Sequence, residues 1–341
     1  MRRLPFACAV VPVVISNGPS LAFTDRTPAS YLRSAGAMGD SILPLLLGLL
    51  AVAIAVVVIV SVLVVIGILR RRQRSAVPID QIPLSETHAT EWISIGVGVS
   101  TIVLVGLVVW TSITMAHIAN PPTEPALTIE VRGHQWWWEA VYLNENPSQI
   151  FKTANEIHIP VGRPVRFALK GTDVIHSFWV PALGGKTDAI PGQTNLTWLQ
   201  ADRPGVYRGQ CSEYCGQQHA HMDFVVMADA PDSFENWRQA QVLAAPTAQT
   251  AGIREGEQNF VQHCGACHAV RGTRAGGAMG PDLTHLMSRT SLAAGLLPNN
   301  PGYLSGWIAN PQRLKPGSMM PDLDISGPDL ASIRSFLVTL K

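Results

Sequence analysis

The sequence predicts a multi-domain membrane protein that consists of a two-helix transmembrane hairpin, an all-β domain and an all-α domain. Two long apolar segments, at 42–69 and 92–118, contain no Asp, Glu, Lys or Arg. From Thr128 to Met227, short runs of alternating apolar and polar residues are divided by glycine and proline, which is typical of a β-sandwich or barrel. The chain ends in an apolar stripe at helical spacing, formed by Leu330, Ile333, Phe336, Leu337 and Leu340.

The composition narrows the class of protein. The 341 residues are 47% hydrophobic and 14% charged, which is apolar for a soluble protein. The formal net charge is +1 at pH 7, so no basic surface for nucleic acid is expected. The length allows about two or three domains.

The first residues have the features of a secretory signal peptide. Arg2 and Arg3 precede an apolar run that ends near Ala22, and this order predicts a signal peptide over residues 1–23. A lipid anchor on Cys8 is disfavoured, because too little apolar sequence precedes this cysteine.

The two apolar segments predict a transmembrane hairpin over residues 40–119. Each exceeds the ~20 residues that a helix needs to cross the hydrocarbon core of a membrane. Both are far longer than an average globular helix, so a buried core helix fits poorly. The connection between them begins with the cluster Arg70, Arg71, Arg72 and Arg74. Positive charge in a short loop places that loop in the cytoplasm. Everything after about Asn120 is therefore expected on the periplasmic or extracellular side of a bacterial cell membrane.

Changes of pattern give the boundaries of the domains that follow the hairpin. The predicted β domain covers residues 120–235 and begins at a proline cluster that marks the exit from the membrane. A stretch rich in Ala, Gln and Thr predicts a linker over 236–251. The pattern is helical over 252–341, with Ser326 as the expected N-cap of the last helix.

One short loop of the β domain collects soft metal ligands. Cys211, Cys215, His219 and Met222 lie within twelve residues. Thiolate, thioether and imidazole ligands together select copper among the available metals. A single copper ion needs only one cysteine, so two cysteines four residues apart favour a bridged pair of copper ions, each with its own histidine. His176, in a distant Val-Ile-His-Ser-Phe-Trp run, is the natural candidate for the second histidine.

Two alternatives accompany the copper hypothesis. A Cys211–Cys215 disulfide suits an oxidising compartment, but the histidine and methionine in register with the cysteines favour a metal. His221 lies beside His219, and spacing alone barely separates the two imidazoles as ligands.

The last domain contains the attachment pattern of a c-type haem. Cys264-Gly-Ala-Cys267-His268 supplies two thiols for thioether bonds and a proximal histidine for the iron. A zinc site is disfavoured, because His263 and His285 do not follow a metal-ligand spacing.

A methionine is expected as the sixth ligand of the haem iron, because Met/His ligation raises the potential of cytochromes c. Four methionines compete for this place: Met279, Met287, Met319 and Met320. Met320 directly precedes Pro321 in a run just before the final helix, and it is favoured over Met319.

Four motifs of the β domain carry a family resemblance. They are Gly133-His-Gln-Trp136-Trp-Trp-Glu139, Asp173-Val-Ile-His176-Ser-Phe-Trp, Lys186-Thr-Asp188-Ala-Ile-Pro-Gly192 and the Cys211–Met222 loop. With them, residues 40–235 resemble subunit II of cytochrome c oxidase, which implies a cupredoxin-like domain with a dinuclear CuA centre. The Cys-x-x-Cys-His pattern and the Met-Pro loop make residues 252–341 similar to a class I cytochrome c.

The resemblance also implies a role for each motif residue. Cys211 and Cys215 become bridging thiolates, His176 and His219 imidazole ligands, and Met222 a weak axial ligand. The backbone carbonyl of Glu213 becomes a copper ligand, and its side chain reaches a magnesium ion shared with subunit I. Trp136 matches the aromatic residue through which electrons enter from a docked cytochrome. His221 has no role in the family pattern.

The function implied is that of the electron-input subunit of a proton-pumping haem–copper cytochrome c oxidase. Electrons from cytochrome c or another donor, or from the fused haem c, would pass through dinuclear CuA to subunit I, where oxygen is reduced to water. The expected partners are subunit I, subunit III, the electron donor and membrane lipid. Two alternatives stay open: the corresponding subunit of a CuA-type nitric oxide reductase, and a free-standing membrane-anchored electron carrier.

Overall fold

The computed structural model describes residues 26–27, 30–74 and 86–341, with side chains described for residues 30–70 and from 90 onward. The predicted signal peptide and Cys8 lie outside the described residues. So does most of the loop between the two long helices.

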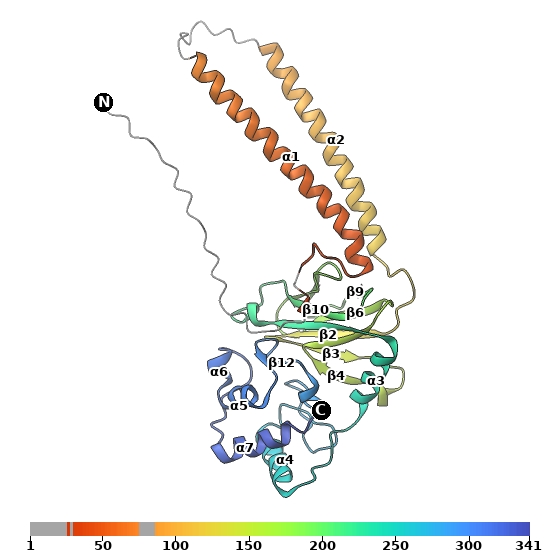
Figure 1. Ribbon diagram of the computed structural model, residues 1–341, viewed down its shortest axis with the longest axis vertical. Coiled ribbons are helices and arrows are strands. Elements are labelled where there is room, and N and C mark those ends of the chain that lie inside the picture. The colour runs from red at the N-terminus through yellow and green to blue at the C-terminus, as the bar shows by residue number, and fades with distance from the viewer. Residues whose placement is uncertain (1–25, 28–29, 75–85) are drawn as a thin grey trace, which may run out of the picture.

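Two long apolar helices, α1 (Ala37–Arg74) and α2 (Glu86–Ile118), run side by side and project from one end of the molecule (Figure 1). Their segments Ala37–Arg70 and Thr90–Ile118 are long and apolar enough to cross a membrane, and their most apolar stretches are 0% buried. An exposed apolar surface of this extent marks contact with a membrane or another protein. The two helices therefore suggest a membrane anchor.

The hairpin is attached to the β domain through backbone groups. The indole N–H of Trp198 donates to the carbonyl oxygen of Ile118, the last residue of α2, at 2.8 Å. Ahead of α1, the amide of Ala35 donates to the carbonyl of Ala182 at 2.8 Å. Both helices thus meet the domain at hydrogen-bonded ends.

The described part of the β domain consists of two sheets. The first has the order β5 (Glu156–Pro160), β11 (Asp223–Asp229), β10 (Gly205–Cys211), β7 (His176–Trp179) and β8 (Thr187–Ala189), with β1 (Arg26–Thr27) paired to β10. The second has the order β4 (Phe151–Ala154), β3 (Trp137–Tyr142), β2 (Thr128–His134), β6 (Val165–Gly171) and β9 (Asn195–Leu199). Short 3-10 turns lie at η2 (Pro147–Gln149) and η3 (His219–His221).

Alternation along the strands buries one aromatic cluster between the sheets. Trp138 from β3 is fully buried and meets Phe178 and Phe224 edge to face, with ring centroids 5.8 and 5.6 Å apart. Phe178 stacks on Phe224 at 4.6 Å. Aromatic pairs in these arrangements contribute about 0.5–1.5 kcal/mol beyond their area burial, so this cluster supports the strand ends that carry the candidate metal ligands.

Helix α3 (Pro231–Val242) runs through the first part of the segment that the sequence analysis assigns to a linker. Its residue Trp237 stacks on His158 of β5 with ring centroids 4.0 Å apart. Apolar residues at helical spacing thus attach α3 to the β domain, and residues 243–250 continue without helix or strand.

The C-terminal domain contains α4 (Ala251–His263), α5 (Pro301–Ala309), α6 (Pro311–Leu314) and α7 (Gly327–Leu337). It also has a 3-10 turn, η4 (Leu286–Ser288), and a short ladder of β12 (Ser291–Leu292) with β13 (Leu297–Pro298). Ser326 caps α7 as expected, since its side chain accepts a hydrogen bond from the amide of Asp329. The multi-domain fold class predicted from the sequence is confirmed, with this ladder as a small addition to the all-α domain.

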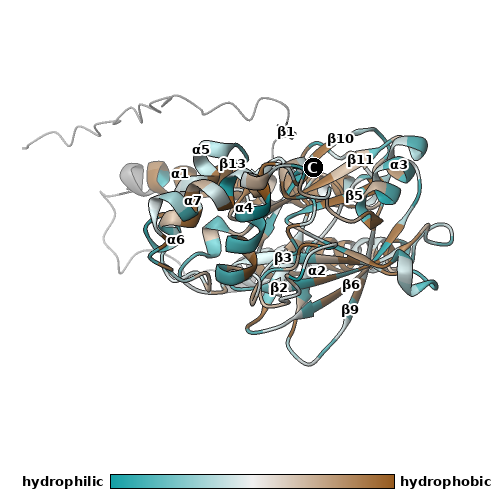
Figure 2. Cartoon of the chain, turned by 90° about the horizontal axis from the view of Figure 1, so that it is seen from below, coloured by the Kyte–Doolittle hydropathy of each residue, from teal (hydrophilic) through white to brown (hydrophobic). Residues whose placement is uncertain are grey.

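The two domains that follow the hairpin are in contact. Figure 1 places the C-terminal domain on the side of the β domain away from the hairpin. Figure 2, viewed from that side, shows α4, α5 and α7 grouped beside β5, β10 and β11, with α4 largely hydrophilic on the visible surface. The opposite faces of α4 and α7 form the core of the domain, where Phe260 meets Phe336 with ring centroids 5.6 Å apart.

Replacement of Gly256 by alanine is expected to destabilise the C-terminal domain. A Cβ atom at Gly256 would lie 2.1 Å from the backbone carbonyl oxygen of Ser332 in α7, so the two helices would have to separate. Overpacking of this kind costs about 1–3 kcal/mol. The check is the thermal unfolding of the full chain in detergent, followed by haem absorbance. Gly252→Ala in the same helix is the matched control, because a Cβ there meets nothing within 4 Å; equal destabilisation by both variants would contradict the prediction.

Candidate functional site

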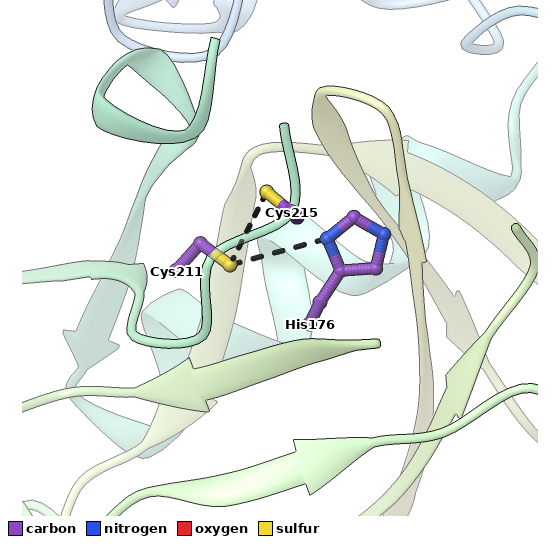
Figure 3. A group of neighbouring side chains, drawn as sticks. All are labelled: His176, Cys211 and Cys215. Atoms are coloured by element: carbon purple, nitrogen blue, oxygen red, sulfur yellow. Dashed lines mark hydrogen bonds between the residues drawn. The ribbon is translucent and has the colours of Figure 1, made fainter. Parts of the chain in front are cut away.

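Three buried side chains form the centre of the candidate metal site. The ligand atoms of His176, Cys211 and Cys215 all lie within 4.8 Å of one another (Figure 3). The two sulfur atoms are 3.8 Å apart, and the Sγ of Cys211 lies 3.9 Å from the Nδ1 of His176. Figure 3 shows the three side chains turned toward one another, so a bound ion could contact all three.

The remaining ligands predicted from the sequence lie around the same sulfur atoms. The Nδ1 of His219 and the Sδ of Met222 are 3.5 and 3.8 Å from the Sγ of Cys215. The backbone oxygen of Glu213 is 3.3 Å from the Sγ of Cys211. The structure therefore brings together all six groups that the sequence analysis assigned to copper. Two thiols, two imidazoles and a thioether are a donor set that fits copper.

Strand pairing explains how residues far apart in the sequence meet here. His176 begins β7 and Cys211 ends β10, and the two strands are antiparallel neighbours with Cys211 opposite Phe178. Beyond the strands, the amide of Ser212 donates to the carbonyl of Ser177 at 2.9 Å. The loop then returns to β11, where the carbonyl of Met222 accepts a hydrogen bond from the Cys211 amide.

The two cysteines are free and differ in their electrostatics. Their 3.8 Å separation is well beyond the ~2.05 Å of a disulfide bond. Contact with Cys215, followed by interaction with His176, lowers the pKa of Cys211 to about 3. The resulting thiolate raises the pKa of Cys215, and burial raises it further. A bound metal ion would favour ionisation of this second thiol, because metal ligands bind as thiolates.

The neighbours of the histidines orient them differently. The Nε2 of His176 lies 2.8 Å from a carboxylate oxygen of Asp173, which leaves Nδ1 on the side of the sulfur atoms. Such outer partners fix the ring orientation of metal-binding histidines. By contrast, the Nδ1 of His221 pairs with the side-chain oxygen of Gln218 at 2.7 Å. The geometry thus favours His219 over His221 as a ligand.

Two other residues assigned by resemblance lie next to the cluster. Trp136 is 8% exposed, and its indole N–H donates to the carbonyl of Cys215 at 3.0 Å. The carboxylate of Glu213 is partly exposed and lies 3.7 Å from the ammonium group of Lys186. Trp136 therefore directly contacts the loop of residues 211–222, which we call the copper loop. The Glu213 side chain faces outward.

The haem attachment residues follow the end of α4. Cys264 is the C-cap of the helix, and the amides of Cys267 and His268 both donate to its carbonyl oxygen. The Nδ1 of His268 lies 2.9 Å from the carbonyl of Pro281, which holds the ring and leaves Nε2 available. Burial lowers the pKa of His268, so the imidazole is neutral, as an axial ligand must be. Burial also raises the pKa of Cys264 to about 11, which suits a neutral thioether better than a zinc thiolate.

An apolar cavity adjoins this turn and fits a haem. Cys264, His268 and Met320 all line it, together with apolar side chains of the C-terminal domain. Met319 and Met279 are 80% and 73% exposed, and Met287 does not line the cavity. Among the four methionines considered from the sequence, Met320 therefore has the position expected of a ligand to a group in this cavity.

Two residues at this cavity did not stand out in the sequence. Arg289 lines the wall as a half-buried cation and donates to the carbonyl of Asp282, and desolvation lowers its pKa. Asn155 reaches the cavity from the β domain, and its side-chain oxygen accepts from the amide of Trp138 at 2.8 Å. No local pattern in the sequence marked either residue.

Lys315 is a third residue that sequence reasoning missed. It is 2% exposed, and its ammonium group donates to three backbone carbonyl oxygens, those of Trp136, His221 and Ala293. Burial lowers the pKa of Lys315 to about 7. Three carbonyl acceptors match the three protons of the ammonium form, so the geometry suits the charged side chain.

A buried acidic cluster with one histidine connects the domains at another point. His158 lies 2.6 Å from Asp229 and 3.4 Å from Glu156. The other carboxylate oxygen of Glu156 accepts hydrogen bonds from the amide and the hydroxyl of Thr290, each at 2.9 Å. Although burial opposes both charges, the pairing raises the pKa of His158 and lowers that of Glu156.

The thermal stability of the chain is expected to depend on pH through this cluster. His158 contributes to the free energy of unfolding because its pKa is higher in the folded state. This contribution is complete below the ordinary pKa of 6.5 and is lost as pH rises through the raised folded-state pKa. The contribution of Glu156 is complete above its ordinary pKa of 4.5 and is lost as pH falls through its lowered folded-state pKa. The cluster therefore stabilises most between about pH 4.5 and 6.5. His158→Gln should flatten the alkaline limb of a melting-temperature profile in detergent, and an unchanged limb would contradict this assignment.

Comparisons with known proteins place both domains. A family model described as cytochrome c oxidase subunit II, periplasmic domain, matches residues 140–229, and one described as cytochrome c matches residues 253–341. Cytochrome c oxidase subunit 2 of Alkalihalophilus pseudofirmus is 39% identical over 270 residues, which cover 77% of each chain. That of Bacillus subtilis is 31% identical over 337 residues, which cover 93% of this chain and 91% of the relative. The crystal structure of the periplasmic domain of subunit II of cytochrome oxidase from Bradyrhizobium japonicum is 34% identical, with a TM-score of 0.33, and covers 35% of this chain and 95% of that one.

A membrane-anchored protein with a thiolate-rich copper site and a c-type haem site belongs to the class of respiratory electron-transfer proteins. The chain belongs to the cytochrome c oxidase subunit II family, with a cytochrome c domain at its C-terminal end. Family membership implies CuA copper and haem c, and the His176, Cys211 and Cys215 cluster is consistent with the former. It also supports an electron-input role in a haem–copper oxidase complex.

Proposed function

We propose that this chain is the electron-input subunit of a proton-pumping haem–copper oxidase that reduces oxygen to water. Electrons from cytochrome c or another donor reach the C-terminal domain, pass to the copper site of the β domain and continue into subunit I. Copper and haem, when bound, supply the one-electron chemistry that the side chains of this chain cannot. Oxygen reduction itself belongs to subunit I.

The convergence of six ligand groups on two sulfur atoms carries this proposal. The thiolates of Cys211 and Cys215 and the imidazoles of His176 and His219 would hold the dinuclear copper centre. Met222 and the carbonyl of Glu213 would be its further ligands. The carboxylate of Asp173 holds the His176 ring, and β7 and β10 hold the sulfur atoms in place. A rigid ligand set of this kind limits rearrangement when an electron arrives or leaves.

The residues of the C-terminal domain hold and shield the second redox site. Cys264 and Cys267 would fasten the haem, while His268 and Met320 would hold its iron. The carbonyl of Pro281 orients His268, and the apolar cavity walls exclude water. Arg289 supplies a half-buried positive charge that suits an acidic substituent of the haem.

The complex and its place in the cell are part of the same proposal. The exposed apolar helices suit lipid and the apolar helices of subunits I and III. The partly exposed carboxylate of Glu213 would reach a magnesium ion at the junction with subunit I. The arginine cluster at the end of α1 (Arg70, Arg71, Arg72 and Arg74) favours a bacterial cell membrane with both redox domains on the periplasmic or extracellular side.

Metal and haem content of the full-length chain, purified in detergent, tests the proposal. Two copper ions and one covalent haem per chain, with a mixed-valence paramagnetic signal, are expected. Copurification of a large haem-bearing subunit that reduces oxygen would separate an oxidase from a free-standing carrier, and from a nitric oxide reductase. One copper ion or none in the loaded chain would refute the electron-input role.

A further inference from the structure

A buried lysine joins the two redox domains at the copper loop. The ammonium group of Lys315 lies 2.7 Å from the carbonyl oxygens of Trp136 and His221, both in the β domain. A third carbonyl, that of Ala293 in its own domain, lies at 3.0 Å. We call these four residues the Lys315 junction. A buried charge costs much free energy unless all of its protons are hydrogen-bonded, and here each proton has an acceptor.

The indole ring of Trp136 is enclosed between the two domains beside this junction. Gly216 of the β domain lies against the ring, where a Cβ would be 3.1 Å from it. Gly317 of the C-terminal domain also lies against the ring, where a Cβ would be 3.6 Å from it and 2.9 Å from the side-chain oxygen of Gln217. Gly317 has a φ of +81°, which L side chains rarely adopt. This glycine therefore permits the close approach of the C-terminal domain to Trp136.

Further hydrogen bonds connect the copper loop to the segment that carries Met320. The side-chain amide of Gln218 donates to the carbonyl of Pro316 at 2.9 Å. Within the C-terminal domain, the side-chain amide of Gln312 donates to the carbonyl of Met320 at 2.6 Å, and its oxygen accepts from the amide of Gly317. Movement of Lys315 would therefore displace the wall of the haem cavity relative to the copper loop.

We propose that Lys315 is a positioning residue that seats the cytochrome domain on the copper loop and so sets the rate of electron transfer between the two redox sites. In each transfer one electron is lost at the haem site and gained at the copper site, with no bond made or broken. Trp136, covered by residues 315–317, receives electrons from within this chain and is closed to a separate protein. A diffusible donor must then dock on the C-terminal domain. The inference rests on the proposed function.

The test compares Lys315→Met with two other variants in the full-length chain loaded with copper and haem. Methionine keeps an unbranched side chain, one atom shorter than that of lysine, and removes all three donors. We expect electron transfer from haem to copper, measured after flash photoreduction, to slow by about tenfold or more, as small misplacements of reacting groups do. Hydrogen exchange in peptides 213–223 and 311–322 should accelerate by about tenfold to a hundredfold, because charged hydrogen bonds are lost. The optical spectra of both centres should stay unchanged.

Lys315→Arg and Thr290→Val give the proposal its controls. Arginine keeps the charge, but its planar fork cannot direct three donors from one atom, so an intermediate rate is expected. Thr290→Val removes one hydrogen bond to Glu156 at a different point of the domain contact and should leave the transfer rate within about twofold of the wild-type value. A wild-type rate and wild-type exchange in Lys315→Met would overturn the proposal, as would equal slowing by Thr290→Val.

The exchange measurement separates this inference from the proposed function, because it needs no copper. A chain that fails to bind copper would refute the electron-input role. Faster exchange of peptides 213–223 and 311–322 in Lys315→Met would still support the Lys315 junction, and unchanged exchange would overturn it.

Discussion

Replacement of Cys215 by serine is expected to abolish the dinuclear copper site while leaving the haem intact. The Sγ of Cys215 lies within 3.8 Å of three other proposed ligand atoms, those of Cys211, His219 and Met222. A serine hydroxyl is a hard, neutral donor that cannot bridge two copper ions. Copper content should fall from two ions to one or none, and the mixed-valence signal should disappear. Oxidase turnover should drop by more than about 100-fold, since loss of even outer-shell partners costs 10–100-fold.

His221→Gln is the matched control for the copper prediction. His221 lies two residues after His219, but its ring pairs with Gln218. Its contact with Lys315 uses the backbone carbonyl, which the substitution keeps. His221→Gln should therefore retain both copper ions, whereas His219→Gln should lose at least one. If His221→Gln lost copper and His219→Gln kept it, the ligand assignment would be reversed.

The metal ligands could be predicted from the sequence because most of them lie in one loop. Four of the six groups fall between Cys211 and His219, so chemistry and spacing were enough to suggest copper. His176 is 35 residues away from Cys211; the need of each copper ion for its own histidine made it a candidate, and the resemblance then assigned it to the site. The structure gives the reason for their contact, which is the pairing of β7 with β10.

The contacts between the two domains could not be predicted in this way. Lys315 and Trp136 are 179 residues apart, and Glu156 and Thr290 are 134 residues apart. Residues so far apart form no motif that can be recognised in the sequence. In addition, Lys315 donates to backbone carbonyl oxygens, which every residue has, so no particular residue type marks its partners. Helix α3 was missed for a related reason: the sequence between the domains looked like a polar linker, and the packing of Phe234 and Trp237 against the β domain attaches it.

Replacement of Met320 by alanine is expected to change the haem more than any other single methionine substitution. Met320 lines the cavity with His268 and Cys264, and it is the proposed sixth ligand of the iron. Loss of the thioether should convert the haem from low spin to high spin and lower its reduction potential. A fall on the order of 0.1–0.3 V lies within the ≈0.8 V span that axial ligands control. Redox titration of the full-length chain in detergent, with optical detection of haem c, measures this change.

Met319→Ala is the control that decides between neighbouring methionines. Its side chain is 80% exposed and lies one residue earlier in the same loop, so the substitution should leave both the spin state and the potential as in the wild type. The copper signal should persist in both variants, because neither methionine belongs to the copper ligands.

A Met320→Ala haem that still takes up electrons, but at a lower potential, should transfer them to copper with a larger driving force. Slow turnover in that variant would then arise from the earlier step, the reduction of the haem by its donor. An unchanged potential in Met320→Ala, together with a high-spin haem in Met319→Ala, would identify Met319 as the sixth ligand. The loop after Lys315 would then have to change conformation so that the Met319 side chain enters the cavity.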